Sequence, residues 1–412
     1  MRIPFIALLS LAACAESVDL DNDPEEGSIE EGVLLARPVV ISIHADAAPA
    51  LVAYREGVRG AWRAATRISA TEYQARVRGP YTMIAACDLG YPSVQMVSQT
   101  PADGADLQVY CAPYQELPYV ASGTMVQPGQ VSLGGWRRSS TRANWAFELF
   151  SGEGDKDLVA ATADRVHIQR ALPVHGNLTL APLDLSSQGS ALDTVTFTPT
   201  NSFAGETPYV STFIMSPRID PQAQIYSGPM TGAKVAPAAV LGGDVTQEVS
   251  LRSQLVDDTH FLLRSARHPF RAGDATSVTF WDPFTGYHFA VDQGVASVSW
   301  CARADMDYAY LSLSSANGGI YDLFATRNYL QATRVRKLTL DLSAPGILPQ
   351  WLPTFDTEYQ ATLSSNRGTT DRVGFSYTET FNLGVYPPAL TGAKQGARAA
   401  RELRRAAVLP LD

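Results

Sequence analysis

Several features that would place the chain in a familiar class of protein are missing from its sequence. No apolar run reaches the roughly 18–20 residues that a membrane-spanning helix needs. Charged residues are sparse at 18%, and the formal net charge of -9 argues against nucleic acid as a partner, because phosphate binding needs a basic face. Since 45% of the 412 residues are hydrophobic, the chain has enough apolar side chains for folded cores.

Catalytic and metal-binding signatures are also missing. The chain contains no G-x-S-x-G, S-x-x-K or H-E-x-x-H motif, no P-loop and no dinucleotide-binding fingerprint. Its six histidines are scattered, and its four cysteines form no C-x-x-C pair. We therefore expect no catalytic residue, no metal ion and no cofactor.

The N-terminus carries the strongest signal in the sequence. Arg2 is followed by an apolar stretch, residues 3–13, which is typical of a secretory signal peptide. Residues 11–14 read LAAC and resemble the lipobox of bacterial lipoproteins. The resemblance implies cleavage before Cys14 and acylation of its thiol, and Ala15 after it favours the outer membrane of a Gram-negative cell. The alternative is an ordinary signal peptide in which Cys14 has no special role.

Both ends of the chain are expected to lie outside the folded domains. Residues 14–36 contain eight carboxylates and no basic residue, so this segment repels itself and is predicted to be an acidic, disordered tether. Residues 394–412 are rich in alanine and arginine and are predicted to form a basic helical tail. The tail either contacts lipid headgroups or the tether, or is simply solvated.

Alternation of apolar and polar residues dominates from residue 38 onward, which predicts antiparallel strands with one solvated face. Turn clusters and a proline-flanked connector divide the chain into three predicted domains: a β-sandwich at 37–113, a second at 119–200 and a larger one at 201–393. The predicted fold class is therefore all-β, with tandem antiparallel β-sandwich domains.

Within the second domain, residues 122–135 (SGTMVQPGQVSLGG) resemble the opening of a transthyretin-like or carboxypeptidase-regulatory-like domain. Such domains begin with a strand, a Gly/Pro turn and a second strand. The resemblance implies an accessory β-sandwich without an active site.

Two of the cysteines are predicted to form a disulfide. Cys87 and Cys111 each lie on the apolar phase of a predicted strand, so both side chains can face one interior. An exported chain meets an oxidising compartment, which permits a bridge. The alternative is a pair of buried free thiols. Cys301 has no local partner and is expected to be a buried free cysteine.

Isolated polar residues offer weaker candidates for a site. Asp305 and Asp307 share one strand face, and two carboxylates about 7 Å apart can bind calcium or act as a glycosidase pair. The more ordinary interpretation is a solvated strand edge beside Tyr308 and Tyr310. His260 lies in a similar cluster with Asp257 and Asp258.

Histidine and tryptophan provide two further candidates. His167 and His175 are expected on neighbouring strands, where they could come together; the more ordinary interpretation is exposed polar surface. Exposed tryptophans would form a carbohydrate platform, but spread singly through the chain they are mainly expected to be core residues. The six are Trp62, Trp136, Trp145, Trp281, Trp300 and Trp351.

Together these patterns predict a non-enzymatic, outer-membrane-anchored surface lipoprotein that acts in adhesion, scaffolding or ligand binding. Its expected partners are the membrane, through the N-terminal lipid anchor, and an unidentified protein or glycan. The alternative is a glycan-binding or hydrolytic module within residues 201–393. That module would need Asp305, Asp307 or His260 in one pocket beside an exposed tryptophan.

Overall fold

A computed structural model describes residues 37–111, 119–133, 144–148, 154–202, 205–256, 260–271, 273–280, 288–292, 295–303, 306–315, 318–353, 358–368 and 374–385. These residues form β-strands joined by turns, with two short α-helices, α2 (Leu185–Gln188) and α3 (Arg327–Thr333). Three 3-10 turns complete the elements: η1 (Pro101–Asp103), η2 (Ala238–Val240) and η3 (Pro349–Trp351). The predicted all-β fold is therefore confirmed. Cys14, the acidic tether and the basic tail lie outside the described residues, and no described helix is long and apolar enough to cross a membrane.

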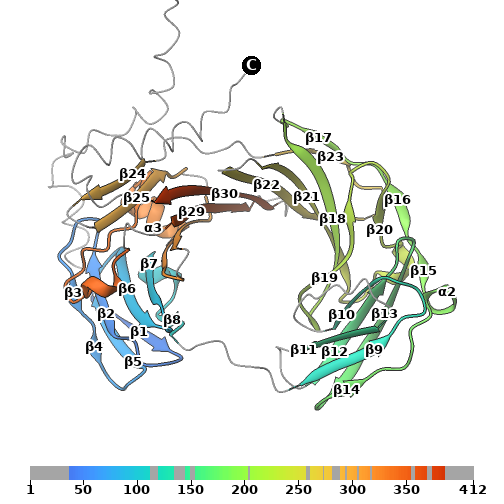
Figure 1. Ribbon diagram of the computed structural model, residues 1–412, viewed down its shortest axis with the longest axis horizontal. Coiled ribbons are helices and arrows are strands. Elements are labelled where there is room, and N and C mark those ends of the chain that lie inside the picture. The colour runs from blue at the N-terminus through green and yellow to red at the C-terminus, as the bar shows by residue number, and fades with distance from the viewer. Residues whose placement is uncertain are drawn as a thin grey trace, which may run out of the picture.

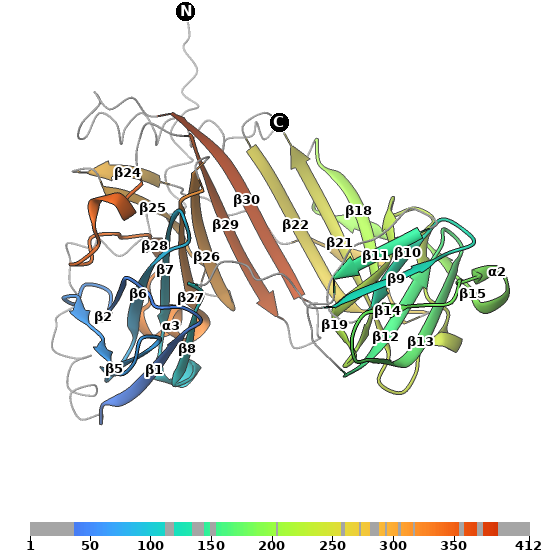
Figure 2. The ribbon, with the colours of Figure 1, turned by 60° about the horizontal axis from the view of Figure 1, so that its bottom comes forward.

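The largest sheet, called the main sheet below, has twelve strands drawn from both ends of the described chain (Figure 2). In spatial order they are β19 (Ile219–Gly228), β18 (Thr207–Ser216), β21 (Thr246–Val256), β22 (His260–Pro269), β30 (Gly374–Val385), β29 (Glu358–Gly368), β26 (Tyr308–Ser315), β27 (Ile320–Thr326), β7 (Pro92–Gln99), β6 (Tyr81–Asp88), β2 (Leu51–Glu56) and β3 (Arg63–Ala64). Neighbouring strands are antiparallel except β7 and β27, which pair in parallel with Ser93 opposite Ile320.

Figure 1 shows the main sheet curved into an arch, with three small sheets on its outer side. One has the strand order β24 (His288–Asp292), β25 (Val295–Cys301) and β28 (Lys337–Thr339). Its Trp300 and Leu338 share a hydrophobic cluster with Leu311 and Leu323 of the main sheet. The other two pair β16 (Asp193–Val195) with β20 (Ala233–Val235) and β17 (Thr198–Thr200) with β23 (Ser277–Thr279).

The end of the arch that contains β6, β2 and β3 is part of a β-sandwich. A sheet with the order β4 (Thr66–Arg67), β5 (Glu72–Val77), β1 (Val39–Ala45) and β8 (Asp106–Val109) packs on β2 and β6 through a core that includes Ile41, Val77 and Met83. Within this core Cys87 and Cys111 form a disulfide with a Cα–Cα distance of 5.1 Å, as the alternation predicted.

The prediction of a free, buried Cys301 is wrong. Cys301 is half-buried at the end of β25 and is disulfide-bonded. No cysteine among the described residues is free, so the partner of Cys301 lies outside them. The search for a local partner missed this bond because a disulfide can join positions that are distant in sequence.

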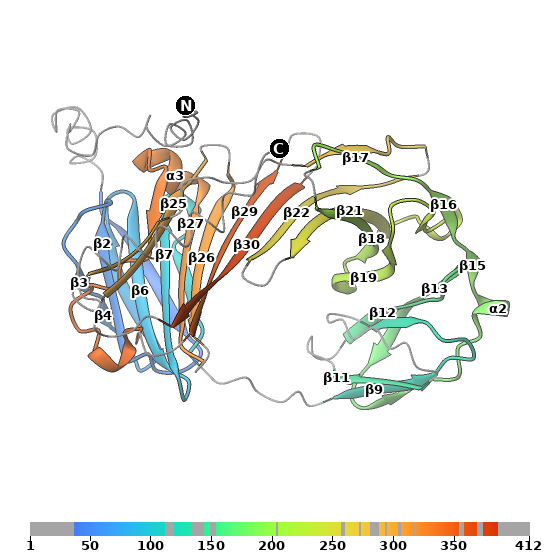
Figure 3. The same cartoon turned by 45° about the horizontal axis from the view of Figure 1, so that its top comes forward.

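The other end of the arch carries a second sandwich (Figure 3). Its two sheets have the orders β10 (Gln130–Leu133), β12 (Gly154–Ala161), β13 (Arg165–Val174), β15 (Ser190–Ala191) and β11 (Asn144–Glu148), β9 (Val120–Thr124), β14 (Leu178–Thr179). Leu158 and Trp145 lie in the core between them, while Val159 and Val166 pack against Ile214 of β18. The main sheet joins strands from the predicted segments 37–113 and 201–393. The division of the chain into three separate domains therefore stays a prediction.

Candidate functional site

The acidic candidates from the sequence do not converge. Asp307 precedes β26 and forms an ion pair with Arg327 at 2.5 Å, while Asp305 lies outside the described residues. His260 begins β22, and β30 and β29 separate that strand from β26. Three strand spacings amount to about 14 Å, so the backbones that carry Asp307 and His260 are far apart.

The histidine pair is also separated. His167 lies in β13 and His175 directly follows the end of the same strand, so the expectation of neighbouring strands is wrong. Eight residues of extended chain span roughly 26 Å. The Nδ1 atom of His167 instead lies 3.1 Å from the carbonyl oxygen of Gln188.

The described tryptophans belong mainly to the cores. Trp145 and Trp300 are buried, and Trp62 and Trp351 are half-buried beside the cluster under the main sheet. The other two tryptophans lie outside the described residues. The four described indoles therefore form no exposed carbohydrate platform.

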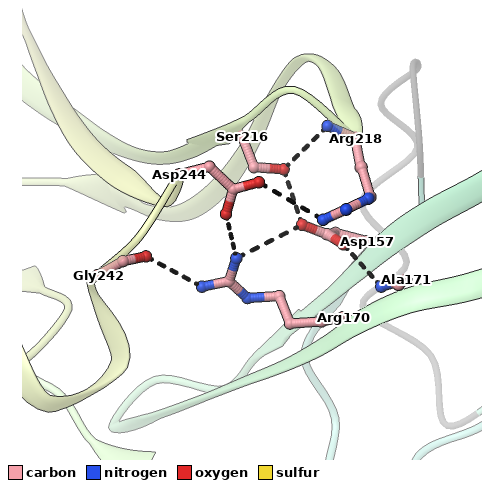
Figure 4. A network of polar contacts seen from close by, with 7 residues as sticks. All are labelled: Asp157, Arg170, Ala171, Ser216, Arg218, Gly242 and Asp244. Carbon is pink, nitrogen blue, oxygen red and sulfur yellow. Dashed lines mark hydrogen bonds and ion pairs between the residues drawn. The ribbon is translucent and has the colours of Figure 1, made fainter.

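Figure 4 shows a polar network between the second sandwich and the main sheet. The side chain of Asp157 is fully buried, and its carboxylate accepts hydrogen bonds from the Ala171 amide at 2.9 Å and the Ser216 hydroxyl at 2.8 Å. The pairing of β12 with β13 shifts by one residue beside Asp157, and Ala171 has a positive φ of 50°. Asp157 therefore holds a β-bulge in place and links it to β18.

Two arginines and a second carboxylate complete this network. Arg170 bonds Asp244 at 2.8 Å, and Arg218 reaches the same carboxylate at 3.4 Å. The two arginines balance the two aspartates in charge, and the hydrogen bonds connect the second sandwich to β18 of the main sheet. We assign the network a structural role.

A different set of side chains lines the inner side of the arch. Along β26 and β27 buried residues alternate with half-exposed ones, so the hydroxyls and one carboxylate face solvent while the aliphatic residues face the core. Register extends this face to β29, where Thr362 lies opposite Ser312 and Ser364 opposite Tyr310. We call it the polar face: Tyr308, Tyr310, Ser312, Ser314, Asp322, Phe324, Thr362 and Ser364.

Aromatic rings and a carboxylate form the centre of the polar face. The rings of Tyr308 and Phe324 lie 5.2 Å apart between centroids, with a tilt of 31°. The hydroxyl of Tyr310 donates a hydrogen bond to Oδ1 of Asp322 at 2.7 Å. Burial raises the pKa of Tyr310 to about 12, so the phenol stays protonated and continues to donate at neutral pH. The donor fixes the position of the Asp322 carboxylate, which has further acceptor positions.

Comparison with known proteins identifies no family for this chain. No protein-family model matches it, and no curated protein is significantly similar to it. The function must therefore be argued from the site itself.

The polar face combines apolar ring surfaces with hydrogen-bonding groups. Aromatic rings offer flat apolar surfaces, while hydroxyls both donate and accept hydrogen bonds. Within the described residues no three His, Cys, Asp or Glu side chains are placed to hold a metal ion. From the sequence, Tyr308 and Tyr310 were noted only as neighbours of the Asp305 and Asp307 pair, and the structure places their strand, β26, between β29 and β27. The alternation in YAYLSLSS was the available signal.

Proposed function

We propose that the protein is a non-enzymatic, cell-surface lipoprotein whose polar face binds a glycan. One observation carries the proposal: the paired rings of Tyr308 and Phe324 lie beside the Tyr310–Asp322 hydrogen bond on a solvated sheet face. A sugar ring has C–H-rich faces that pack on aromatic side chains and a rim of hydroxyls that pair with polar groups.

The composition of the face favours a neutral glycan over a charged ligand. Asp322 is its single acidic residue, and the polar face contains no lysine, arginine or histidine. A carboxylate prefers donors, which sugar hydroxyls supply, and repels phosphate and sulfate groups. A polyanionic ligand is therefore disfavoured.

Rigidity of the supporting strands also favours a binding role. The residues between the polar side chains, including Leu311, Leu313 and Leu323, are buried at 0–2% exposure in the largest cluster. A binding surface held on packed strands loses little conformational entropy when the ligand binds.

The sequence at the N-terminus supports attachment to a membrane. Acylation of Cys14 would bury hydrocarbon at roughly 0.8 kcal/mol per methylene, enough for stable anchoring when more than one chain is present. The tether of residues 14–36 would then extend up to about 80 Å from the anchor at its full length. This reach would present the polar face to polysaccharide near the envelope.

A glycan array tests the proposal. Full-length protein in detergent is applied to neutral and acidic oligosaccharides, beside the Tyr310→Ala and Tyr110→Ala variants. Tyr110 is the matched control, because its side chain is 67% exposed on the first sandwich. We expect neutral glycans to bind, Tyr310→Ala to lose the signal and Tyr110→Ala to keep it. Binding that survives in Tyr310→Ala, or no binding by any variant, would contradict the proposal.

A further inference from the structure

A cavity lies on the opposite side of the main sheet from the polar face. It has a volume of about 400 Å³, within the range typical of small-molecule sites. Its walls come from β2, β6, β7 and β27 of the main sheet, from β25 and β28 of the small sheet, and from α3. Two sheets and a helix thus line it, and it shares no residue with the polar face.

Cationic side chains dominate the charge of this cavity. Arg55, Arg59 and Lys337 line it, against the single carboxylate of Asp341. Nη1 of Arg55 bonds Asp341 at 3.1 Å, and its guanidinium lies 4.6 Å from the centre of the Trp62 ring. Two contacts therefore hold the guanidinium in a fixed position.

The Nε donor of Arg55 indicates that an acceptor is missing. This atom is buried and has no hydrogen-bond partner among the described residues. Buried donors are almost always paired, and one on a charged group is especially costly to leave unpaired. A carboxylate in the cavity would compensate this buried positive charge, since a guanidinium binds a carboxylate with two parallel hydrogen bonds.

The remaining walls favour an organic ligand over a small inorganic ion. Met96, Leu323 and Leu338 supply an apolar surface. Beside them, the buried hydroxyl of Thr82 lies 2.8 Å from that of Ser98 and 3.4 Å from that of Tyr329. We propose that this cavity binds a compact organic monocarboxylate, with its carboxylate on Arg55 and Lys337 and its body against the apolar wall.

Benzoate and its neutral isostere benzamide test this assignment, because they share size and shape and differ in charge. Binding to the full-length protein is measured by calorimetry and by saturation-transfer NMR. We expect saturable binding of benzoate, at least tenfold tighter than benzamide, that weakens as salt rises to 1 M. Equal affinities for the two, or no saturable binding of benzoate, would overturn the proposal.

Three variants locate the bound anion. Arg55→Gln and Lys337→Gln should each weaken benzoate binding about tenfold and leave benzamide unchanged. Arg63→Gln is the control, because that side chain is 64% exposed on β3 and outside the cavity. Lys337 is exposed, so Lys337→Gln decides the outcome if Arg55→Gln fails to fold. Wild-type affinity in Lys337→Gln would overturn the proposal.

Discussion

At the scale of single residues, buried charge has the largest expected effects on stability. Asp157 combines complete burial with hydrogen bonds from two donors on separate strands. Removing its carboxylate leaves the Ala171 amide and the Ser216 hydroxyl without their acceptor, and unsatisfied buried groups cost about 1–3 kcal/mol each.

We expect Asp157→Ala to lower the free energy of unfolding by roughly 3 kcal/mol in urea denaturation. Asp106→Ala is the matched control, because the Asp106 side chain is 76% exposed and its carboxylate lies 3.6 Å from Nε2 of His44. The control should unfold near the wild-type midpoint. A shift of the same size in both variants would show that Asp157 has no special role.

His268 gives stability a dependence on pH. Its pKa lies below the usual 6.5 because burial disfavours the imidazolium, and the charges of Asp274 and Glu248 oppose this shift without reversing it. As pH falls below 6.5 the unfolded chain therefore takes up the proton before the folded protein does. The free energy of unfolding should fall with pH in this window and level off below the folded-state pKa.

The His268→Gln variant isolates this effect from the other histidines. Denaturation of wild type and variant at pH 8 and at pH 5 should give a smaller loss of stability at low pH in the variant. Identical pH dependence in the two proteins would assign the effect to other groups.

At the scale of elements, the disulfide ties β6 to the end of β8 across the core of the first sandwich. The bond joins residues with a sequence separation of 24. By restricting the unfolded chain, a disulfide that closes a loop of this size stabilises the folded protein by about 3 kcal/mol. We expect the double variant Cys87→Ala/Cys111→Ala to lose about that amount in urea denaturation. An unchanged midpoint would show that packing around these residues stabilises the sandwich without the bond.

Local patterns explain which elements were predictable. The alternation through Tyr81, Met83 and Cys87 predicted a strand, which the structure has as β6, but β6 is buried on both faces and not on one alone. The same pattern placed Cys87 and Cys111 in one interior. The spacing of apolar residues and the types of side chain can be read from a few neighbouring residues. The sequence therefore shows directly where such a strand lies.

Pairing between distant strands was not predictable. The parallel register of Ser93 with Ile320 joins the first sandwich to the rest of the main sheet, and no local motif encodes it. The polar face depends on the registers of β26 with β27 and with β29, so its composition was not visible in the sequence. Without the neighbouring strands, the sequence shows two tyrosines in phase but not Phe324 and Asp322 beside them.

At the scale of the whole molecule, the lipid anchor is a prediction of its own. Acylated protein should partition into detergent and resist extraction by 1 M salt, because hydrocarbon burial does not depend on ionic strength. Cys14→Ser should leave an uncleaved precursor or a soluble periplasmic form, whereas deletion of residues 394–412 should leave fractionation unchanged. A Cys14→Ser protein with the wild-type mature mass and detergent partitioning would contradict the anchor.

Mass spectrometry without reductant adds a second test of the anchor. One sulfur cannot carry a lipid and a disulfide together, so an acylated N-terminal peptide and a Cys14–Cys301 bridge exclude each other. The lipoprotein assignment predicts the acylated peptide. Because Cys301 is disulfide-bonded and Cys87 pairs with Cys111, the lipoprotein assignment requires Cys301 to bridge a second molecule. A Cys14–Cys301 peptide would contradict the assignment.

The central claim is that the polar face binds a neutral glycan, and isothermal titration tests it most directly. Full-length protein is titrated with the oligosaccharide that gives the strongest array signal, beside the double variant Tyr308→Ala/Phe324→Ala and the Tyr110→Ala control. Aromatic contacts are each worth about 0.5–1.5 kcal/mol, so the double variant should lose about tenfold in affinity while the control keeps the wild-type value. Equal affinity in all three proteins would show that the glycan binds elsewhere.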